Sequence, residues 1–444
     1  YEANLRGTKI GCREGDCGAC TVLIGSLHGE TVQYKSVTSC LTPLANVHGQ
    51  HVVTVEGLNL PGRLLNKAQE AMVSHSATQC GFCTPGFVVS LCGYALNGKK
   101  ADAASSVGAI DGNICRCTGY KSIERAAADL AGQLEDKDAA EPLFWLVSKG
   151  FLPDYFLNIP ARLLQLSNGS EQAVSGRTPI GGGTDLYVQK HHEIPDMELR
   201  FMARHKAADA IVCDGPSCTL SAQATATELM EAAPLSEAVP RWWQFFKLVS
   251  STPIRNIGTV AGNLANASPI GDLTIMLLAL GARLTLADED ISTEREIALE
   301  KFYLAYKKLD KTPAEIIRSI QFDIPRKGQL FNFEKVCKRQ YLDIASVNTA
   351  LLVTLESGII TEARCAMGGV APIPKYLQET SRFLEGRVLT AETIREAETV
   401  LQTEISPISD VRGTVEYKRL LTRQLFFAHF LELFPQTIQM EDLL

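Results

Sequence analysis

The residues most able to do chemistry near the start of the chain are three cysteines within residues 11–21 (GCREGDCGACT). Cys12, Cys17 and Cys20 follow the spacing C-x4-C-x2-C, and Cys40 is the next cysteine along the chain. Closely spaced thiolates bind zinc, Cu(I) or iron–sulfur clusters. Zinc sites usually consist of short cysteine knuckles, whereas this spacing followed by a distant cysteine is typical of plant-type [2Fe–2S] clusters. The pattern therefore predicts a [2Fe–2S] cluster, with a zinc loop or buried thiols as the alternatives.

A second set of four cysteines follows in two pairs. The stretch QCGFCTPG holds Cys80 and Cys83, and NICRCTGY holds Cys115 and Cys117. Taken alone, such pairs could also bind zinc. Beside a plant-type loop, a second iron–sulfur cluster is the better interpretation. The remaining five cysteines are scattered, mostly in apolar segments, and are predicted to be small buried hydrophobic residues: Cys92, Cys213, Cys218, Cys337 and Cys365.

The elements that would carry the two sets differ in hydrophobic periodicity. CTVLIG, TVQYKSV and HVVTVEG are short and rich in β-branched residues, which predicts a small sheet beside the first set. Residues 58–135 are predicted to be helical, with the second set at helix ends. We expect Thr84 to cap one helix, with Pro85 at its first helical position, and Thr118 to cap another. A helix upstream is marked by Leu64, Leu65, Ala68 and Met72.

A glycine turn stands out in the middle of the chain. After the charged stretch EDKDAAEP at residues 135–142, which we interpret as a linker, short strands alternate with helices. The segment TPIGGGTDLYVQK then places Gly181, Gly182 and Gly183 between a strand and a helix. Backbone N–H groups in such a turn can bind an anion, and Thr184 can donate a hydrogen bond. A plain tight turn is the alternative, because the pattern is not the G-x-G-x-x-G dinucleotide fingerprint.

A second polar loop lies at residues 255–273 (RNIGTVAGNLANASPIGDL). So many small and amide side chains favour a backbone that lies close to a polar ligand. Asp272 is placed to cap the apolar helix that follows. Farther on, Lys335 is an isolated cation beside a predicted strand, and an exposed, solvated lysine is its alternative interpretation.

The remaining segments predict an α+β module at the C-terminal end. ARLTLADEDISTEREI is predicted to be strand, turn and strand, and ALLVTLESGIITEARCAMGGV a hairpin. Helices are expected around residues 376–386, 391–402 and 414–432. We find no H-E-x-x-H, G-x-S-x-G or Walker A motif and no candidate catalytic triad.

Composition narrows the class of protein. Of the 444 residues, 45% are hydrophobic, enough for several cores, and the net charge of −7 argues against a nucleic-acid partner. No apolar run reaches the length of a membrane span. Clustered cysteines in a long chain without a visible secretory signal predict a reducing, cytoplasmic location.

Four motifs, taken in order along the chain, resemble the xanthine dehydrogenase family of molybdenum hydroxylases. They are the first cysteine set, the second cysteine set, the segment GGGTDL and the segment GNLANASPIGD. The resemblance covers essentially the whole chain, including YKKLDKTPAEII and SPISDVRGTVEYK. It implies a subunit in which iron–sulfur and flavin domains share one chain while a larger partner binds molybdopterin, in an assembly with two copies of each. The family's first β-hairpin is expected to be absent from this sequence.

The resemblance implies an α+β multidomain fold. A plant-ferredoxin-like β-grasp domain would span residues 1–57 and a four-helix [2Fe–2S] domain residues 58–135. After a linker at 136–150, a flavin domain like that of vanillyl-alcohol oxidase would span residues 151–328. An α+β domain like the C-terminal domain of the CO dehydrogenase flavoprotein would span residues 329–444.

The resemblance also implies the cofactor ligands, namely two [2Fe–2S] clusters and one FAD. The first cluster would be bound by Cys12, Cys17, Cys20 and Cys40, and the second, nearer molybdenum, by Cys80, Cys83, Cys115 and Cys117. The expected FAD contacts in the first loop are Gly181, Gly182, Gly183, Thr184, Asp185 and Leu186. Those in the second loop are Gly258, Thr259, Gly262, Asn263, Asn266, Ser268 and Asp272. Ile317 and Lys335 would lie beside the isoalloxazine, and Tyr306 near the path of the nicotinamide.

The function implied is electron transfer from the partner's molybdenum through the two clusters to FAD and then to NAD, in purine hydroxylation. No residue of this chain would catalyse the hydroxylation itself. Val249 stands where relatives commonly have an aromatic residue, and Leu342 where some have an acidic one, so oxygen remains an alternative acceptor. Two further functions stay open at this point. One is a molybdenum hydroxylase for an aldehyde, nicotinate or similar substrate, and the other is a zinc-binding module without enzyme activity.

Overall fold

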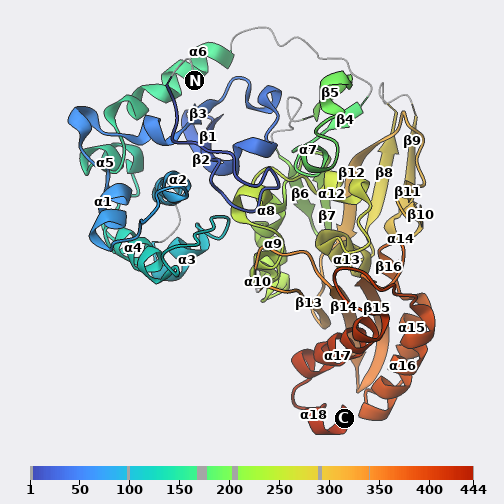
Figure 1. Ribbon diagram of the computed structural model, residues 1–444. Coiled ribbons are helices and arrows are strands. Elements are labelled where there is room, and N and C mark those ends of the chain that lie inside the picture. Colours follow the sequence, from blue (N-terminus) through green and yellow to red (C-terminus); the bar gives the residue numbers. More distant parts are fainter. Residues whose placement is uncertain are drawn as a thin grey trace. The chain divides into compact units, whose positions relative to one another are not determined.

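The computed structural model describes residues 4–97, 101–167, 178–202, 209–288, 293–339 and 341–443. The chain forms two compact units. Unit 1 comprises Tyr1–Arg204 and Ser251–Ile257, and unit 2 comprises His205–Ser250 and Gly258–Leu444. Both units combine helices with strands, so the chain has an α+β fold (Figure 1).

Unit 1 begins with a three-stranded antiparallel sheet in the order β2-β1-β3. The strands are β1 (Thr21–His28), β2 (Thr31–Thr38) and β3 (His51–Val53), as the β-branched segments predicted. The hairpin register pairs Thr21 with Thr38. Because Cys20 immediately precedes β1 and Cys40 lies two positions after the end of β2, this register brings two cysteines distant in sequence to the same end of the hairpin.

Helices follow, as predicted for residues 58–135, and they share one core with β1 and β3. This core contains Phe87, Leu91, Ile123 and Leu130, all with no exposed surface. The helices are α1 (Lys67–Ser74), α2 (Thr84–Leu96), α3 (Ala103–Gly108) and α4 (Lys121–Gly132).

Three predicted helix starts are wrong in detail. Thr84 is the first residue of α2 and not its cap, and Cys83 occupies the cap position without a side-chain hydrogen bond. Thr118 does not cap α4, whose cap is Tyr120, because its hydroxyl is engaged by the thiol of Cys115. Helix α1 begins only at Lys67, after a capping box formed by Asn66 and Gln69. Leu64 and Leu65 therefore lie before the helix, and both are exposed.

The rest of unit 1 is made of short elements. The predicted linker holds a helix, α5, whose Leu146 is buried in the core with the earlier helices. After α6 come two parallel strands, β4 and β5, with α7 between them, so the glycine turn lies between strand and helix as predicted. The bounds are α5 (Pro142–Ser148), α6 (Ile159–Ser167), β4 (Thr178–Ile180), α7 (Leu186–Gln189), β5 (Leu199–Phe201) and α11 (Thr252–Arg255).

Unit 2 contains a five-stranded antiparallel sheet in the order β6-β7-β12-β8-β9. Its strands are β6 (Ile211–Asp214), β7 (Ser217–Ser221), β8 (Arg283–Ala287), β9 (Glu294–Ala298) and β12 (Ile316–Asp323). The accompanying elements are α8 (Ala226–Met230), α9 (Ala233–Ala238), α10 (Trp242–Lys247), α12 (Val260–Asn266), α13 (Asp272–Ala279), α14 (Leu299–Phe302), β10 (Tyr303–Ala305) and β11 (Lys308–Leu309). The strands predicted around residues 282–297 are confirmed as β8 and β9, and part of the turn between them lies outside the described residues.

A second sheet of unit 2 has the order β13-β14-β15-β16, and the predicted hairpin is β14 and β15. Helix α13 contacts β14 and β15, while α15 contacts β15 and α17 contacts β13 and β14 (Figure 1). Strand β14 is therefore buried along most of its length. The bounds are β13 (Gln329–Val336), β14 (Val347–Glu356), β15 (Ile359–Gly368), β16 (Lys375–Tyr376), α15 (Gln378–Leu384), α16 (Ala391–Glu404), α17 (Val415–Leu433) and α18 (Met440–Leu443).

The prediction that Cys213 and Cys218 are simply buried hydrophobic residues is wrong. The register of the β6–β7 hairpin places them directly opposite each other, and they form a disulfide. Among the remaining cysteines outside the two sets, Cys92 and Cys365 are buried as predicted, and Cys337 is half-buried.

Candidate functional site

The first cysteine set (Cys12, Cys17, Cys20 and Cys40) lies where the loop before β1 meets the end of β2. The Sγ atoms of Cys20 and Cys40 are 3.3 Å apart. Two thiolates on one tetrahedral metal with bonds of about 2.3 Å would be about 3.8 Å apart, so this pair is close to a shared-metal geometry. The backbone N–H of Glu14 donates to the Sγ of Cys12. The set therefore has paired thiols and a backbone donor directed at sulfur.

Thiol acidity in the first set reflects these contacts. The hydrogen bond shared with Cys40 lowers the pKa of Cys20 to about 6, although burial acts in the opposite direction. The same shared bond, together with burial, raises the pKa of Cys40. Burial raises the pKa of Cys17, and the neighbouring Cys12 adds to this rise. Cys20 therefore loses its proton at a lower pH than Cys40, and the remaining thiol proton is shared between the two sulfurs.

The second cysteine set (Cys80, Cys83, Cys115 and Cys117) lies at the start of α2 and in the loop before α4. The Sγ atoms of Cys80 and Cys117 are 3.6 Å apart, again close to the distance between two thiolates on one metal. Burial and then the adjacent Cys115 raise the pKa of Cys83 to about 12. The thiols therefore lie in two neighbouring pairs, and two thiolates on each of two irons is the ligand count of a [2Fe–2S] cluster.

The glycine loop, Gly181–Leu186, belongs to unit 1 and packs against the chain just after Cys40. Gly183 has a φ of +80°, and a Cβ there would lie 2.9 Å from Pro43. Asn46 donates to the carbonyl of Gly181 over 2.7 Å. The Oδ1 atom of Asn46 is buried without a hydrogen-bond partner in the described part of the chain. The loop thus has a backbone that only glycine adopts easily and an unsatisfied polar atom beside it.

The second polar loop, Gly258–Asp272, belongs to unit 2 and contains α12. The hydroxyl of Thr259 caps α12 by accepting from the N–H of Gly262. Asn263 accepts a hydrogen bond from Thr274 of α13. Gly262 is exposed, and Asn266 and Ser268 are half-buried. The small polar residues of this loop therefore leave part of its backbone at the surface of unit 2.

Lys335 of β13 is buried and paired. Its side chain is only 1% exposed, and its Nζ lies 2.7 Å from Asp272 and 2.6 Å from the carbonyl of Leu248. Asn348 of β14 donates to the other oxygen of Asp272 over 2.6 Å. Asp272 is the first residue of α13 and makes no capping bond, so the prediction that it caps the helix is wrong. The interpretation of Lys335 as a solvated surface lysine is wrong as well.

Four more predicted residues lie in unit 2. Ile317 of β12 is 5% exposed, and Val249 and Leu342 are 7% and 8% exposed. They are apolar side chains held inside unit 2. In contrast, Tyr306, between β10 and β11, is 64% exposed.

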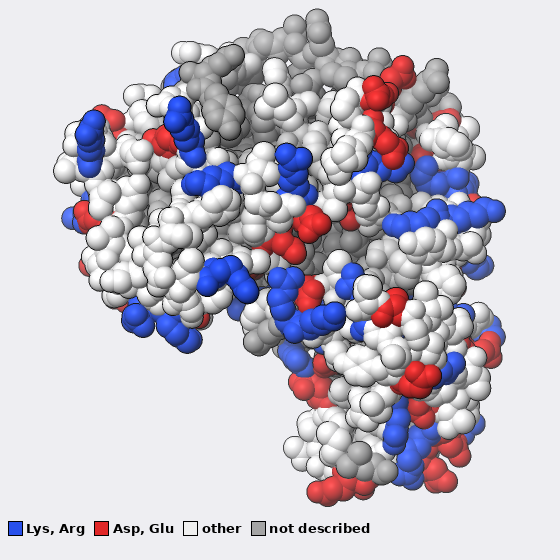
Figure 2. Space-filling model, viewed as in Figure 1, with Lys and Arg blue, Asp and Glu red and all other residues white. Residues whose placement is uncertain are grey.

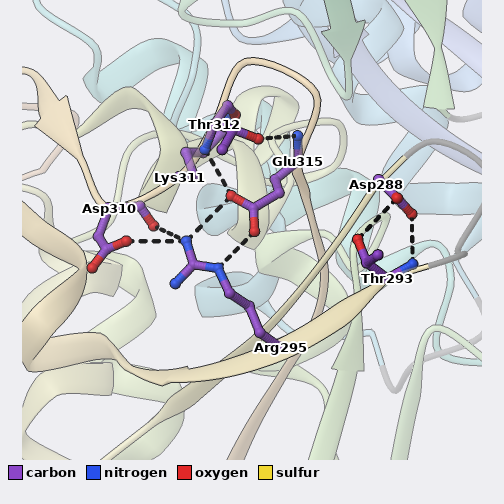
Figure 3. A network of polar contacts seen from close by, with 7 residues as sticks. All are labelled: Asp288, Thr293, Arg295, Asp310, Lys311, Thr312 and Glu315. Atoms are coloured by element: carbon purple, nitrogen blue, oxygen red, sulfur yellow. Dashed lines mark hydrogen bonds and ion pairs between the residues drawn. The ribbon is translucent and has the colours of Figure 1, made fainter.

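Tyr306 lies in the hairpin of β10 and β11, and Asp310, which directly follows this hairpin, takes part in the ion pairs drawn in Figure 3. Arg295 of β9 binds Glu315 over 2.6 Å and Asp310 over 3.0 Å, and the hydrogen bond from Arg295 lowers the pKa of Glu315 to about 2. Next to Tyr306, the Nζ of Lys307 lies 2.9 Å from the Oδ1 of Asn266. The hairpin is therefore tied to the second polar loop.

Basic and acidic side chains are interspersed over the face of the molecule drawn in Figure 2.

Several polar residues with close contacts to these predicted residues were missed by the sequence reasoning. Asn46, Asn113, Arg255 and Asn348 each bind a partner more than 70 positions away in the chain, which local spacing does not reveal. The only signal in the sequence was the occurrence of these residues beside the recognised motifs, as in NICRCTGY for Asn113.

Three stretches of the chain match known domain families. Residues 54–128 match the [2Fe-2S] binding domain, residues 157–326 the FAD binding domain in molybdopterin dehydrogenase, and residues 333–433 the CO dehydrogenase flavoprotein C-terminal domain. In this order, the three matches make the chain similar to the iron–sulfur and flavin region of molybdenum hydroxylases. The chain thus contains stretches that match a [2Fe-2S] binding domain, an FAD binding domain and a C-terminal flavoprotein domain.

Curated relatives include xanthine dehydrogenase 1 of Arabidopsis thaliana, which is 29% identical over 97% of this chain and 37% of the relative. Another is the xanthine dehydrogenase/oxidase of Gallus gallus, 27% identical over 96% of this chain and 37% of the relative. The chain spans a little over a third of the length of these relatives.

Two solved structures share the fold. A carbon monoxide dehydrogenase of Hydrogenophaga pseudoflava has a TM-score of 0.52, with 20% identity over 57% of this chain and 88% of that one. Quinoline 2-oxidoreductase of Pseudomonas putida 86 has a TM-score of 0.51, with 20% identity and the same coverage.

Two features are absent from the described residues. No helix there is long and apolar enough to cross a membrane. Over the same ranges, no group of three or more His, Cys, Asp or Glu side chains is arranged to hold a single metal ion.

Proposed function

We propose that this chain is the electron-transfer subunit of a xanthine dehydrogenase, carrying two [2Fe–2S] clusters and one FAD. The observation that carries the proposal is the arrangement of eight thiols as two sets in unit 1, each containing a pair of sulfurs 3.3 Å or 3.6 Å apart. The domain matches and the resemblance to named xanthine dehydrogenases support it.

The residues of the chain would hold and separate the cofactors. The first cysteine set would bind one cluster and the second set the other. Residues Gly181–Leu186 and Gly258–Asp272 would bind FAD, with Ile317 and Lys335 beside its ring. When bound, the clusters pass single electrons, and the flavin collects two and delivers them as a hydride to NAD.

The electrostatic environment of the flavin would be set by a pair of charges. Lys335 is a cation that would stabilise the negative charge of a reduced flavin, because burial weakens solvent screening. Asp272 lies 2.7 Å from it and opposes this effect. The potential of the bound flavin would therefore depend on both residues, with Asn348 holding Asp272 in place.

Hydroxylation of the substrate would take place on a molybdopterin-binding partner subunit, in an assembly with two copies of each subunit. The partner would supply the molybdenum-dependent step. Xanthine or hypoxanthine is the proposed substrate and NAD the proposed acceptor.

Metal and flavin analysis of the purified chain tests the cofactor assignment. We expect about four irons and one FAD per chain, with the absorption spectrum of [2Fe–2S] clusters. Stoichiometric zinc in place of iron would overturn the proposal in favour of a zinc-binding module.

Turnover of the complete two-subunit complex tests the substrate and the acceptor. We expect xanthine oxidation that depends on NAD and is slow in air-saturated buffer alone. Equal rates without NAD would identify an oxygen-reducing oxidase. Turnover of an aldehyde or nicotinate but not xanthine would identify another molybdenum hydroxylase.

A further inference from the structure

The two cysteine sets are joined within unit 1 by one short stretch of chain, residues 111–114, here called the bridging segment. The backbone N–H of Ile114 donates to the carbonyl of Cys17 over 3.0 Å. Ile114 directly precedes Cys115 of the second set. One hydrogen bond therefore connects the main chain of one set to that of the other.

Asn113 of the bridging segment holds this contact in place. It is 6% exposed, and its Nδ2 donates to the carbonyl of Gly18 over 3.1 Å. Its Oδ1 accepts from the hydroxyl of Ser90 of α2 over 2.7 Å. Asn113 thus links the first cysteine loop to the helix that begins next to Cys83.

The backbones meet so closely at this point that side chains are excluded. A Cβ on Gly18 would lie 2.3 Å from the carbonyl oxygen of Gly112, and one on Gly86 would lie 2.2 Å from that of Gly18. Because backbone atoms cannot move aside as a flexible side chain can, the separation of the two loops is narrowly defined here.

The bridging segment is also anchored from its other side. Asp111 accepts hydrogen bonds from the N–H of Thr252 over 2.8 Å and from the guanidinium of Arg255 over 2.7 Å. Arg255 is 4% exposed, so this ion pair is largely desolvated. A buried, multiply hydrogen-bonded pair of this kind fixes geometry because breaking it leaves an unpaired charge.

We propose that Asn113 is a positioning residue that sets the rate of electron transfer between the two cluster sites. It does so by holding the Cys17 carbonyl against the N–H of Ile114. The transfer moves one electron from the cluster on the second set to the cluster on the first and changes no covalent bond or proton. The inference rests on the proposed function, because it requires both clusters.

The test compares Asn113→Asp and Asn113→Ala with the matched variant Asn66→Asp in the full chain. Asn66 is similarly buried, and its Nδ2 also donates to a main-chain carbonyl, that of Leu58, over 2.9 Å. It therefore controls for the loss of one buried hydrogen bond and for an added carboxyl group. A limiting amount of dithionite is mixed with the chain, and rapid-freeze EPR follows the approach of the two cluster signals to their equilibrium ratio.

We expect both Asn113 variants to slow this redistribution while each retains four irons, and Asn66→Asp to keep the original rate. Unchanged rates in the Asn113 variants would overturn the inference. Slowing by Asn113→Asp alone would assign the effect to charge and would also overturn it. Absence of iron from the unmodified chain would instead contradict the proposed function.

A further variant keeps the inference testable if the Asn113 variants lose a cluster. Thr21→Val removes a hydroxyl that donates to the same Gly18 carbonyl over 2.6 Å and keeps the shape of the side chain. With both clusters present, we expect slower redistribution in this variant, and an unchanged rate would overturn the inference.

Discussion

The two cysteine sets have similar sulfur spacing but very different surroundings. In the first set Cys20 is buried and its three companions are half-buried, on a loop packed between a hairpin and neighbouring segments. In the second set Cys115 is buried and Cys83 half-buried, but Cys80 and Cys117 are exposed, at a helix start and in a loop. The comparison teaches that two sets of four thiols with similar sulfur spacing can differ in exposure, because only the second set has fully exposed members. The proposed order of electron flow uses this difference, with the exposed set facing the electron donor.

Removing one cysteine from each set should produce the largest effects and should separate the two environments. We expect Cys20→Ser and Cys117→Ser each to reduce the iron content from about four to about two. Both variants should lower the melting temperature through loss of a cluster, and Cys20→Ser should lower it further, because it also places a hydroxyl in a buried position. Iron analysis and thermal melting measure the two outcomes. Equal loss of stability would contradict the contrast in burial.

The same pair of variants tests the order of electron transfer in the complete complex. With Cys117→Ser, electrons should stop at the partner subunit, so substrate should reduce neither the remaining cluster nor FAD. With Cys20→Ser, substrate should still reduce the cluster of the second set. Identical EPR spectra after addition of substrate would refute the proposed order.

Glycines beside the cysteines provide a second, smaller contrast. Gly18 and Gly81 both have positive φ, but a Cβ on Gly81 would meet nothing within 4 Å. We expect Gly81→Ala to cost about 1 kcal/mol through its left-handed backbone alone. Gly18→Ala should cost about 3 kcal/mol or more, because its Cβ also collides with the backbone of Gly112. Chemical denaturation measures both values, and equal costs would refute the close packing of the first loop.

Thiol reactivity in the metal-free chain should sharpen the comparison further. Cys80 and Cys117 should be alkylated first by iodoacetamide at neutral pH. Cys20 should react last although its pKa is about 6, because a buried thiolate is inaccessible even when ionised. Mass spectrometry of the alkylated peptides gives the order. Early labelling of Cys20 would show that the first loop opens in solution.

The smallest expected effect concerns the charge pair of unit 2, Lys335 and Asp272, which we propose lies beside the flavin. Lys335→Ala should lower the potential of bound FAD, and Asp272→Asn should raise it, each by on the order of tens of millivolts. The exposed Lys301 provides a control, and Lys301→Ala should leave the potential unchanged. Redox titration with flavin content measured in parallel checks this. A shift of the same sign in both variants would contradict opposing roles for the pair.

Local patterns in the sequence were sufficient for much of the architecture and for the chemistry of the sites. The strands β1, β2, β14 and β15, the helices of residues 58–135 and the glycine turn follow from periodicity and spacing, because these properties depend on neighbours a few positions apart. The two four-cysteine sets were likewise recognisable, since most cysteines of each set come in short motifs with a spacing typical of iron–sulfur sites.

Only the tertiary structure decided how these motifs are held. It buries Lys335 against Asp272, 63 positions away, and places Asn113 on Gly18, 95 positions away. It also diverts Thr118 from a predicted helix cap to the thiol of Cys115, and Asp272 from a cap to Lys335. Local propensity cannot foresee such choices, because a polar side chain takes whichever partner the folded chain brings within hydrogen-bonding distance. Once it is buried there, leaving it unpaired costs more than any local preference provides.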